Sequence, residues 1–301
     1  MLKIQKYAAV DIGSNAVRLL ISNIIEQNDK SVVFKKNSLV RVPIRLGADV
    51  FINGKISEFN QQRMLDTMTA FSLLMKSHGV SRYKACATSA MREASNSADL
   101  TKRIFNVCGI SIDIIGGEEE AAIIAATDLN TYIDPNKTYL FVDVGGGSTE
   151  FSIIHNGEKV QSKSFRIGTV RLLNDIVKKE VWDQLEHWIK ENTQNYYKIE
   201  LIGSGGNINK IFKISGKDLG KPLTYFYLTT YYKMLQNYSY EERITELNLN
   251  QDRADVIIPA TRIYLSAMKW SGAKHIYVPK IGLSDGIIKS VYYETVTSVS
   301  V

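Results

Sequence analysis

The sequence predicts an α/β protein with two similar domains that face each other across a cleft. Its 301 residues suffice for about two domains of ordinary size. Apolar, β-branched runs alternate with helical patterns along the chain, which is typical of α/β folds. One pattern also occurs twice: residues 10–15 read VDIGSN and residues 142–147 read VDVGGG, 143 − 11 = 132 positions apart. A repeat of this length is too long for a solenoid and indicates two related domains.

The first half begins with a predicted β-hairpin over residues 7–25, where apolar runs flank a Gly-Ser-Asn turn. Residues 32–47 are predicted to continue as extended chain. A helix is predicted next, with Ser57 as its N-cap and Gly79 at its end, because apolar residues recur at helical spacing between them.

Two shorter segments complete this half. Residues 83–94 have the pattern of a strand that runs into a loop and a helix, and residues 110–129 that of a strand, two glycines and a helix. The second helix opens with Glu118, Glu119 and Glu120, and acidic side chains in a first turn are favoured by the helix dipole.

The second half repeats the order of strand, glycine turn and strand over residues 139–160, with a hairpin turn at Asn156-Gly157. The later predicted elements are a helix over 182–197, a strand, turn and helix over 199–215, a helix over 253–272, and a strand, loop and helix over 275–293.

A boundary between the domains is expected near residues 130–137, because Asp134-Pro135-Asn136 is a turn signal. The predicted domains are therefore residues 1–132 and residues 133–301.

Charge and composition exclude several classes of protein. The net charge of +6 favours an anionic partner, but the basic residues are scattered and form no nucleic-acid-binding module. The sequence contains no stretch of about 20 apolar residues that would predict a membrane span, and its N-terminus lacks the apolar core of a signal peptide. A cytoplasmic location is therefore expected. The two cysteines, Cys86 and Cys108, are too few for a disulfide framework and lack metal-ligand spacing.

Three glycine turns are candidate phosphate sites, because successive backbone N–H groups form an anion-binding concavity. The first offers Gly13, Ser14 and Asn15, followed by Arg18, whose guanidinium matches phosphate oxygens. The second is the Gly-Gly-Gly-Ser-Thr run 145–149, and the third is GSGGN at 203–207. None of them has the spacing of a Walker loop or of a dinucleotide-binding turn.

Carboxylates accompany these turns. Asp11 and Asp143 end apolar strands, where a bare carboxylate is costly unless it is paired or bound to a metal. Asp143 and Glu150 are therefore candidate ligands of Mg²⁺ or groups that position water. A glutamate of the run Glu118–Glu120 suits general-base activation of water, and helix geometry alone leaves Glu119 and Glu120 both open.

The order and spacing of seven motifs resemble the exopolyphosphatase / guanosine pentaphosphate phosphatase family. The motifs are VDIGSNAVRLLI, RLG at 45–47, ATSAMREASN at 87–96, IIGGEEEA at 114–121, FVDVGGGSTEF, RIGTVRL at 166–172 and GSGGN. That family belongs to the actin-like, sugar-kinase-like ATPase superfamily, so the resemblance implies two ribonuclease H-like domains. The chain resembles a short form without the C-terminal helical module of long relatives, which implies a preference for shorter polyphosphates.

The resemblance implies roles for individual residues. Glu120 would be the catalytic base that activates a water for attack on the terminal phosphorus, and Asp143, Gly145 and Glu150 would form the adjacent site for metal and water. With the glycine turns, the expected phosphate-binding residues are Asp11, Gly13, Ser14, Asn15, Arg18, Arg92, Gly145, Gly146, Gly147, Ser148, Thr149, Gly205 and Gly206. Ser284 stands where the family pattern has a basic side chain.

The expected function is an exopolyphosphatase that depends on Mg²⁺ or another divalent cation and releases orthophosphate from the ends of polyphosphate. Guanosine pentaphosphate 5′-phosphohydrolase is the alternative with the same catalytic groups. A nucleotide-binding sensor with little turnover is the alternative from another class. A homodimer is expected, and the aromatic segment 225–232 is a candidate contact for it.

Overall fold

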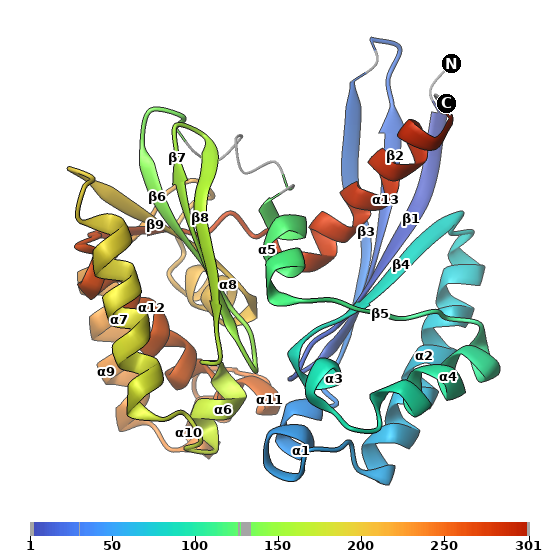
Figure 1. Cartoon of the computed structure of the whole chain (residues 1–301), viewed down its shortest axis with the longest axis horizontal. Coiled ribbons are helices and arrows are strands. Elements are labelled where there is room, and N and C mark those ends of the chain that lie inside the picture. Colours follow the sequence, from blue (N-terminus) through green and yellow to red (C-terminus); the bar gives the residue numbers. More distant parts are fainter. Residues whose placement is uncertain (1–2, 30, 126, 128–133, 300–301) are drawn as a thin grey trace. The chain divides into compact units, whose positions relative to one another are not determined.

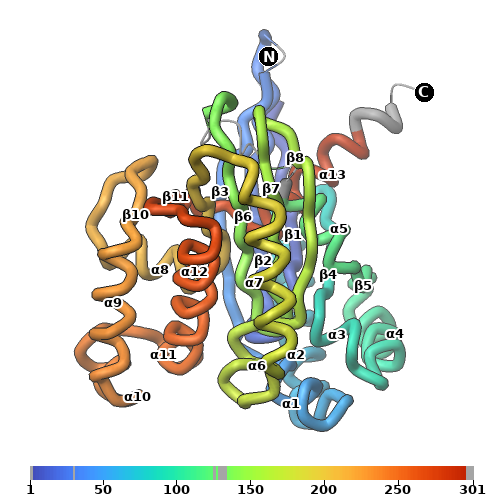
Figure 2. The backbone as a smooth tube through the Cα atoms, turned by 60° about the vertical axis from the view of Figure 1, so that its left-hand side comes forward, coloured from blue at the N-terminus to red at the C-terminus, as the bar shows by residue number. Residues whose placement is uncertain are grey.

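The computed structural model describes residues 3–29, 31–125, 127 and 134–299, and the fold is described for these residues. The chain divides into two compact units (Figures 1 and 2). Unit 1 comprises Met1–Thr127 and Leu283–Val301, and unit 2 comprises Asp128–Gly282. The boundary predicted at 132/133 lies outside the described residues. Because the last helix packs with unit 1, the chain passes from one unit to the other twice.

Unit 1 is built on a five-stranded mixed sheet. Its strands lie in the order β3-β2-β1-β4-β5, with β1, β2 and β3 antiparallel and β4 and β5 parallel to β1. This order is that of a ribonuclease H-like domain, as expected. The strands are β1 Lys3–Ile12, β2 Val17–Glu26, β3 Val32–Val42, β4 Arg82–Ala87 and β5 Asp113–Ile114.

Helices pack against both faces of this sheet. Ala8, Val10 and Ile12 of β1 belong to the apolar core formed with α1 to α4, whereas Tyr7 points to the other face and contacts Tyr292 of α13. Figure 1 shows α13 running along β1 and β2. The helices of unit 1 are α1 Leu46–Asn53, α2 Glu58–His78, α3 Ser89–Glu93, α4 Ser97–Cys108, α5 Gly117–Ala125 and α13 Leu283–Val299.

The predicted hairpin and the helix between Ser57 and Gly79 are confirmed. The Ser57 side chain accepts a hydrogen bond from the Asn60 N–H, and Gly79 ends the helix in a left-handed conformation at φ 67°. The prediction of extended chain up to residue 47 is wrong at its end, because Leu46 and Gly47 begin α1. Leu46 is fully buried, so packing against the core favours the helical turn there.

Unit 2 repeats this sheet and adds one edge strand. Its strands lie in the order β10-β11-β9-β6-β7-β8, so the series β8-β7-β6-β9-β11 corresponds to β3-β2-β1-β4-β5 of unit 1. The predicted hairpin turn at Asn156-Gly157 joins β7 and β8. The strands are β6 Thr138–Val144, β7 Thr149–His155, β8 Glu158–Phe165, β9 Ile199–Ser204, β10 Leu223–Thr224 and β11 His275–Tyr277.

The helices of unit 2 bury an apolar core against this sheet, with α7 and α9 both beside α12 (Figure 2). In the aromatic segment 225–232, Leu228 and Tyr231 are buried, whereas Phe226 is 79% exposed. The helices are α6 Thr169–Leu173, α7 Lys179–Thr193, α8 Gly206–Ile214, α9 Tyr225–Asn237, α10 Tyr240–Thr245, α11 Gln251–Ala254 and α12 Ile257–Ser271. Among the described residues, no helix has the length and apolar character needed to cross a membrane.

Candidate active site

The first glycine turn joins β1 to β2 and is held by the start of α1. The Gly13 N–H donates to the Ala16 carbonyl at 3.1 Å and closes the turn. The Ser14 carbonyl accepts from the Gly47 N–H at 2.8 Å, and the Asn15 carbonyl accepts from the Arg45 N–H at 3.0 Å. The motif RLG at 45–47 thus has a structural role, because its backbone fixes the shape of the turn.

The second glycine turn joins β6 to β7 and is clamped by the start of α6. The Gly145 N–H donates to the Ser148 carbonyl at 3.0 Å, and the Gly146 carbonyl accepts from the Val170 N–H at 2.8 Å. Gly168 approaches so closely that a Cβ there would lie 2.4 Å from the Gly146 backbone. Only glycine fits at this position without displacing the turn.

Arg171 also holds the second turn, and sequence reasoning missed it. Its Nε donates to the Gly147 carbonyl at 2.7 Å, and the side chain is buried. Thr149, predicted to bind phosphate, donates its hydroxyl to the Ile167 carbonyl at 2.5 Å. The signal for Arg171 was its place in the motif RIGTVRL, to which no role had been assigned.

The third turn follows β9 and opens α8, as predicted. Gly205 has φ 115°, and a Cβ there would lie 2.9 Å from the Val144 carbonyl and 3.6 Å from Asp143 Oδ1. The third turn therefore lies against the end of β6, beside the Asp143 carboxylate. Gly206 is the first residue of α8.

Tyr264 of α12 links the ends of β6 and β9. Its hydroxyl donates to the Ser204 carbonyl, and it is fully buried. Burial raises the pKa of Tyr264 well above its usual value, and the neighbouring Asp143 charge raises it further. The hydroxyl therefore stays protonated and remains a donor. Nothing in the sequence singled out this tyrosine, because it lies on a helix far along the chain from either strand.

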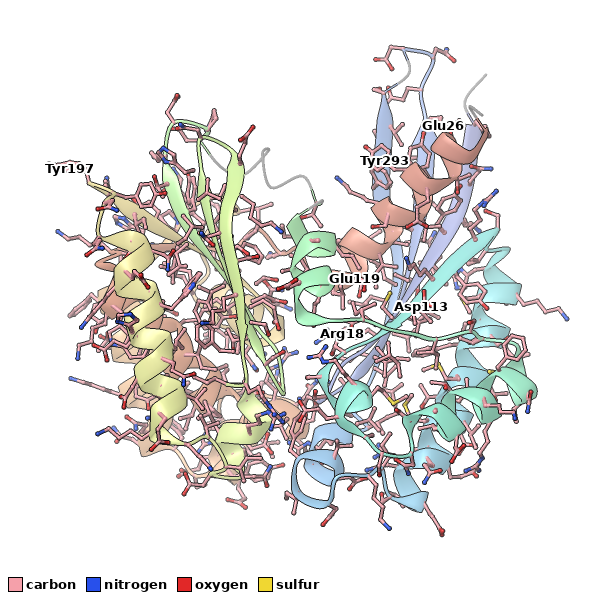
Figure 3. The ribbon with its side chains drawn as sticks, viewed as in Figure 1. Arg18, Glu26, Asp113, Glu119, Tyr197 and Tyr293 are labelled. Atoms are coloured by element: carbon pink, nitrogen blue, oxygen red, sulfur yellow. The ribbon has the colours of Figure 1, made fainter. Side chains whose placement is uncertain are left out.

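In unit 1, Asp11 and Arg18 form the central ion pair of the sheet. They lie directly opposite each other on β1 and β2, and Arg18 Nη1 is 2.7 Å from Asp11 Oδ2. The Asp11 side chain is 4% exposed and that of Arg18 is 34% exposed. Ser284, at the start of α13, donates to the same Asp11 oxygen at 3.5 Å. Figure 3 shows Arg18 near the end of the sheet where β2 begins.

In unit 2, the corresponding pair consists of two carboxylates. Asp143 and Glu150 lie directly opposite each other on β6 and β7, and both are buried. Glu150 Oε1 accepts hydrogen bonds from Ser148 Oγ at 2.6 Å and from Ser164 Oγ at 3.0 Å. Like charges directly opposite in a ladder destabilise it, and a cation between them would remove that cost. Oxygen donors of this kind fit Mg²⁺, and both residues are possible metal ligands.

The three glutamates of α5 differ in exposure. Glu118 and Glu119 are exposed, whereas Glu120 is 8% exposed, and the Glu120 N–H donates to the Gly116 carbonyl at 2.9 Å. Arg92, on α3, donates its Nη1 to the Ile115 carbonyl at 2.7 Å, and Ile115 lies two residues before the start of this helix at Gly117. In unit 1, the hydrogen bond from Arg92 to the Ile115 carbonyl therefore joins α3 to the segment that leads into α5, the helix that carries Glu120.

Cys86 is excluded as a nucleophile. Burial raises the pKa of its thiol to about 12, and the carboxylates Asp113, Asp11 and Glu119 add smaller effects in the same direction. A thiol with this pKa stays protonated near neutral pH and reacts slowly.

The fold and these residues define a class of protein: two-domain α/β proteins whose glycine turns, arginines and carboxylates suit phosphate chemistry. The sequence model of the Ppx/GppA phosphatase family matches residues 24–294. The chain belongs to this family, and the resemblance stated from the motifs is confirmed.

Three curated relatives carry different names. A bifunctional 3-dehydroquinate synthase/phosphatase from Fusobacterium nucleatum is 30% identical over 66% of this chain and 32% of its own length. A guanosine-5′-triphosphate,3′-diphosphate pyrophosphatase from Photobacterium profundum is 29% identical over 56% of this chain and 32% of its own. Exopolyphosphatase 1 from Mycobacterium bovis is 27% identical over 56% of this chain and 48% of its own. The chain thus spans about a third to a half of the length of these relatives.

Two solved structures share the fold over almost their whole length. An exopolyphosphatase from Cytophaga hutchinsonii has a TM-score of 0.82 at 24% identity, over 96% of this chain and 98% of its own. The Ppx/GppA family member of Aquifex aeolicus has a TM-score of 0.74 at 24% identity, over 97% of this chain and 99% of its own. The prediction of two ribonuclease H-like α/β domains is therefore confirmed.

Proposed function

We propose that the chain hydrolyses terminal phosphoanhydride bonds of inorganic polyphosphate and releases orthophosphate. The observation that carries this proposal is the buried Asp143–Glu150 pair, directly opposite on β6 and β7 beside the Gly-Gly-Gly-Ser-Thr turn. Two adjacent carboxylates next to a phosphate-sized turn suit a reaction in which a divalent cation and phosphate oxygens meet. Membership of a phosphatase family supports the same chemistry.

The proposed reaction assigns one role to each group. Glu120 takes a proton from a water, the water oxygen bonds to the terminal phosphorus, and the bridging P–O bond breaks to release orthophosphate from the shortened chain. Arg18 and Arg92 neutralise phosphate charge, and amides of the three glycine turns position the oxygens. Asp143 and Glu150 would hold Mg²⁺, which neutralises negative charge on the phosphate oxygens when bound.

Guanosine pentaphosphate is the alternative substrate. It is favoured by the relative from Photobacterium profundum, whose name specifies a guanosine 5′-triphosphate,3′-diphosphate substrate. The same carboxylates and turns would serve this reaction, because the bond that breaks is again a terminal phosphoanhydride. A cytoplasmic location, a homodimer and the absence of nucleic-acid binding stay predictions of the sequence.

The proposal is tested by measuring orthophosphate release with Mg²⁺ from polyphosphates of defined length, guanosine pentaphosphate and ATP. Glu120→Gln should lower turnover on polyphosphate by about 10²–10⁴-fold, with binding retained, because this is the usual contribution of a general base. Glu118→Gln is the matched control, since it removes an exposed carboxylate from the same helical turn and should leave turnover unchanged.

Each of the other possible results would change the proposal in a specific way. Fast release that survives Glu120→Gln but not Glu119→Gln would move the base to Glu119. Preference for guanosine pentaphosphate would replace polyphosphate as the substrate. Binding without release from any substrate would contradict the hydrolase proposal and favour a nucleotide-binding sensor.

A further inference from the structure

Two buried serines meet beside the first glycine turn. Ser14 belongs to the turn, and Ser89 is the first residue of α3. Their Oγ atoms lie 2.9 Å apart, within hydrogen-bond distance, and the two residues are only 2% and 3% exposed. Ser89 is 75 residues away from Ser14 along the chain, and it has no role in the proposed hydrolysis.

The start of α1 and the start of α3 both contact the Ser14 side chain. Ile12 of β1 lies beside Ala87 of the parallel strand β4, so the first turn and α3 follow their strands at the same edge of the sheet. In α1, a Cβ on Gly47 would lie 3.0 Å from the Ser14 Cβ. Figure 1 shows α1 and α3 next to each other. The contact with α1 fixes the Ser14 Cβ, and the contact with Ser89 fixes the direction of the hydroxyl.

Two donors of this pair have no acceptor among the described residues. A serine hydroxyl has one hydrogen, so one hydrogen bridges the two oxygens and the other is not used within the pair. Neither hydroxyl has a second partner in the described part of the chain, and the Ser14 backbone N–H has none there either. Buried donors are almost always satisfied, so these donors beside a phosphate-sized turn are explained by an oxygen of a bound ligand.

We propose that Ser89 is a positioning residue that donates its hydroxyl to Ser14 Oγ, so that the Ser14 hydroxyl and backbone N–H both bind phosphate oxygens of the substrate. If Ser14 donated to Ser89 instead, its hydrogen would be used within the pair and only the N–H would remain for the ligand. Successive hydrogen bonds in a chain polarise one another, which strengthens the bond to phosphate. The proposal deepens the proposed function and rests on it for the identity of the ligand, a chain of condensed phosphates.

The test is a double-mutant cycle on the binding of tripolyphosphate, measured by calorimetry in EDTA, which removes divalent cations and so suppresses turnover. Ser14→Ala should weaken binding about 10–100-fold, because it removes a hydrogen bond to a charged group. Ser89→Ala should weaken binding about 3–5-fold, because the Ser14 hydroxyl must then be ordered when the ligand binds. In the Ser14→Ala protein, Ser89→Ala should change binding less than about twofold, because Ser89 acts through the Ser14 hydroxyl.

Ser72→Ala is the matched control. Ser72 lies on α2 of the same unit, and its hydroxyl donates to the Cys108 carbonyl at 3.1 Å. Its loss removes a serine hydroxyl away from the turn and should leave tripolyphosphate binding unchanged. An equal effect of Ser89→Ala in the wild type and in Ser14→Ala would show that Ser89 acts independently of Ser14 and would overturn the proposal. A lower melting temperature of Ser89→Ala with unchanged binding would show a purely structural role and overturn it as well.

Hydrolysis of polyphosphate in Mg²⁺ by the same proteins separates the positioning role of Ser89 from the proposed function. Coupled effects of the two serines on tripolyphosphate binding, without hydrolysis of polyphosphate, would support the positioning role and contradict the hydrolase proposal. Hydrolysis with unchanged KM and kcat in both Ser14→Ala and Ser89→Ala would support the hydrolase proposal and contradict the positioning role.

Discussion

The two units carry opposite charges at equivalent positions of equivalent sheets. Asp11 and Asp143 are 143 − 11 = 132 residues apart, and Arg18 and Glu150 are also 150 − 18 = 132 apart. Each aspartate lies at the end of the first strand of its unit, directly opposite Arg18 in unit 1 and Glu150 in unit 2. On the third strand, Arg41 follows in unit 1 and Ser164 in unit 2.

The comparison shows that one backbone geometry can carry side chains of opposite charge beside its glycine turn. The turns match closely, since the Gly13 N–H donates to the Ala16 carbonyl and the Gly145 N–H donates to the Ser148 carbonyl. The side chains on the second and third strands differ: unit 1 has Arg18 and Arg41 there, whereas unit 2 has the Glu150 carboxylate, which accepts from the Ser164 hydroxyl. Substitutions at these positions in either unit test whether the difference in charge matters for ligand binding.

The largest effect is expected from Glu150→Gln. Turnover on polyphosphate should fall about 10²–10³-fold, because the charge that would hold a divalent cation is lost while the hydrogen bonds from Ser148 and Ser164 can persist. Without metal, the variant should gain about 1 kcal/mol in free energy of unfolding, since two buried like charges no longer face each other. Steady-state kinetics over a range of Mg²⁺ concentrations and unfolding in EDTA measure both effects.

Glu158→Gln, at the exposed start of β8, is its control and should change neither quantity. A Glu150→Gln enzyme with full activity and an unchanged Mg²⁺ dependence would show that Glu150 does not hold a cation. This result would contradict the proposed difference in ligand between the two units.

A smaller effect, on stability, is expected from Gly168→Ala. The added Cβ would lie 2.4 Å from the Gly146 backbone, so α6 and the second turn must separate. The free energy of unfolding of unit 2 should fall by about 2–3 kcal/mol, as for other overpacked sites. Urea denaturation measures it, with Gly116→Ala as the control, because a Cβ there meets nothing within 4 Å. Equal stability of the two variants would show that α6 does not clamp the turn.

The smallest effect is expected from Tyr264→Phe, which removes the hydroxyl bound to the Ser204 carbonyl and should cost about 1–2 kcal/mol. Because burial raises the pKa of Tyr264 in the folded state, this tyrosine stabilises the fold below its unfolded pKa of 10.0 and loses that contribution as pH rises further. Wild-type stability should therefore fall more steeply above pH 10 than that of Tyr264→Phe. Chemical denaturation at pH 8 to 11 measures the slopes, and parallel slopes would contradict this assignment.

The sequence sufficed to predict the elements that have local signals. The hairpins around both glycine turns, the helix capped by Ser57 and the acidic start of α5 all follow from turn residues, caps and periodicity. The 132-residue repeat predicted two related domains, because the same short pattern begins each sheet. Arg18 and Glu150 share the 132-residue offset of the repeat, but that each lies directly opposite its aspartate was visible only after the strands were placed in register.

Other features depend on contacts between distant segments, and no local signal gave their structural roles. Arg171 and Tyr264 hold turns that lie 24 and 60 residues away in sequence. The return of α13 to unit 1 is set by packing, since Tyr292 contacts Tyr7 of β1 and Phe34 of β3. That Arg41 of β3 lies directly opposite Arg18 of β2 depends on strand register, which follows from the pattern of buried residues over the whole sheet.

The return of α13 makes the two units differ in how they depend on the chain. Unit 2 is contiguous in sequence, whereas unit 1 combines Met1–Thr127 with Leu283–Val301. Tyr292 of α13 contacts Tyr7 of β1 and Phe34 of β3, so one face of the first sheet is covered by a helix from the far end of the sequence. A cut between Gly282 and Leu283 would leave unit 2 continuous, but it would separate unit 1 into two pieces.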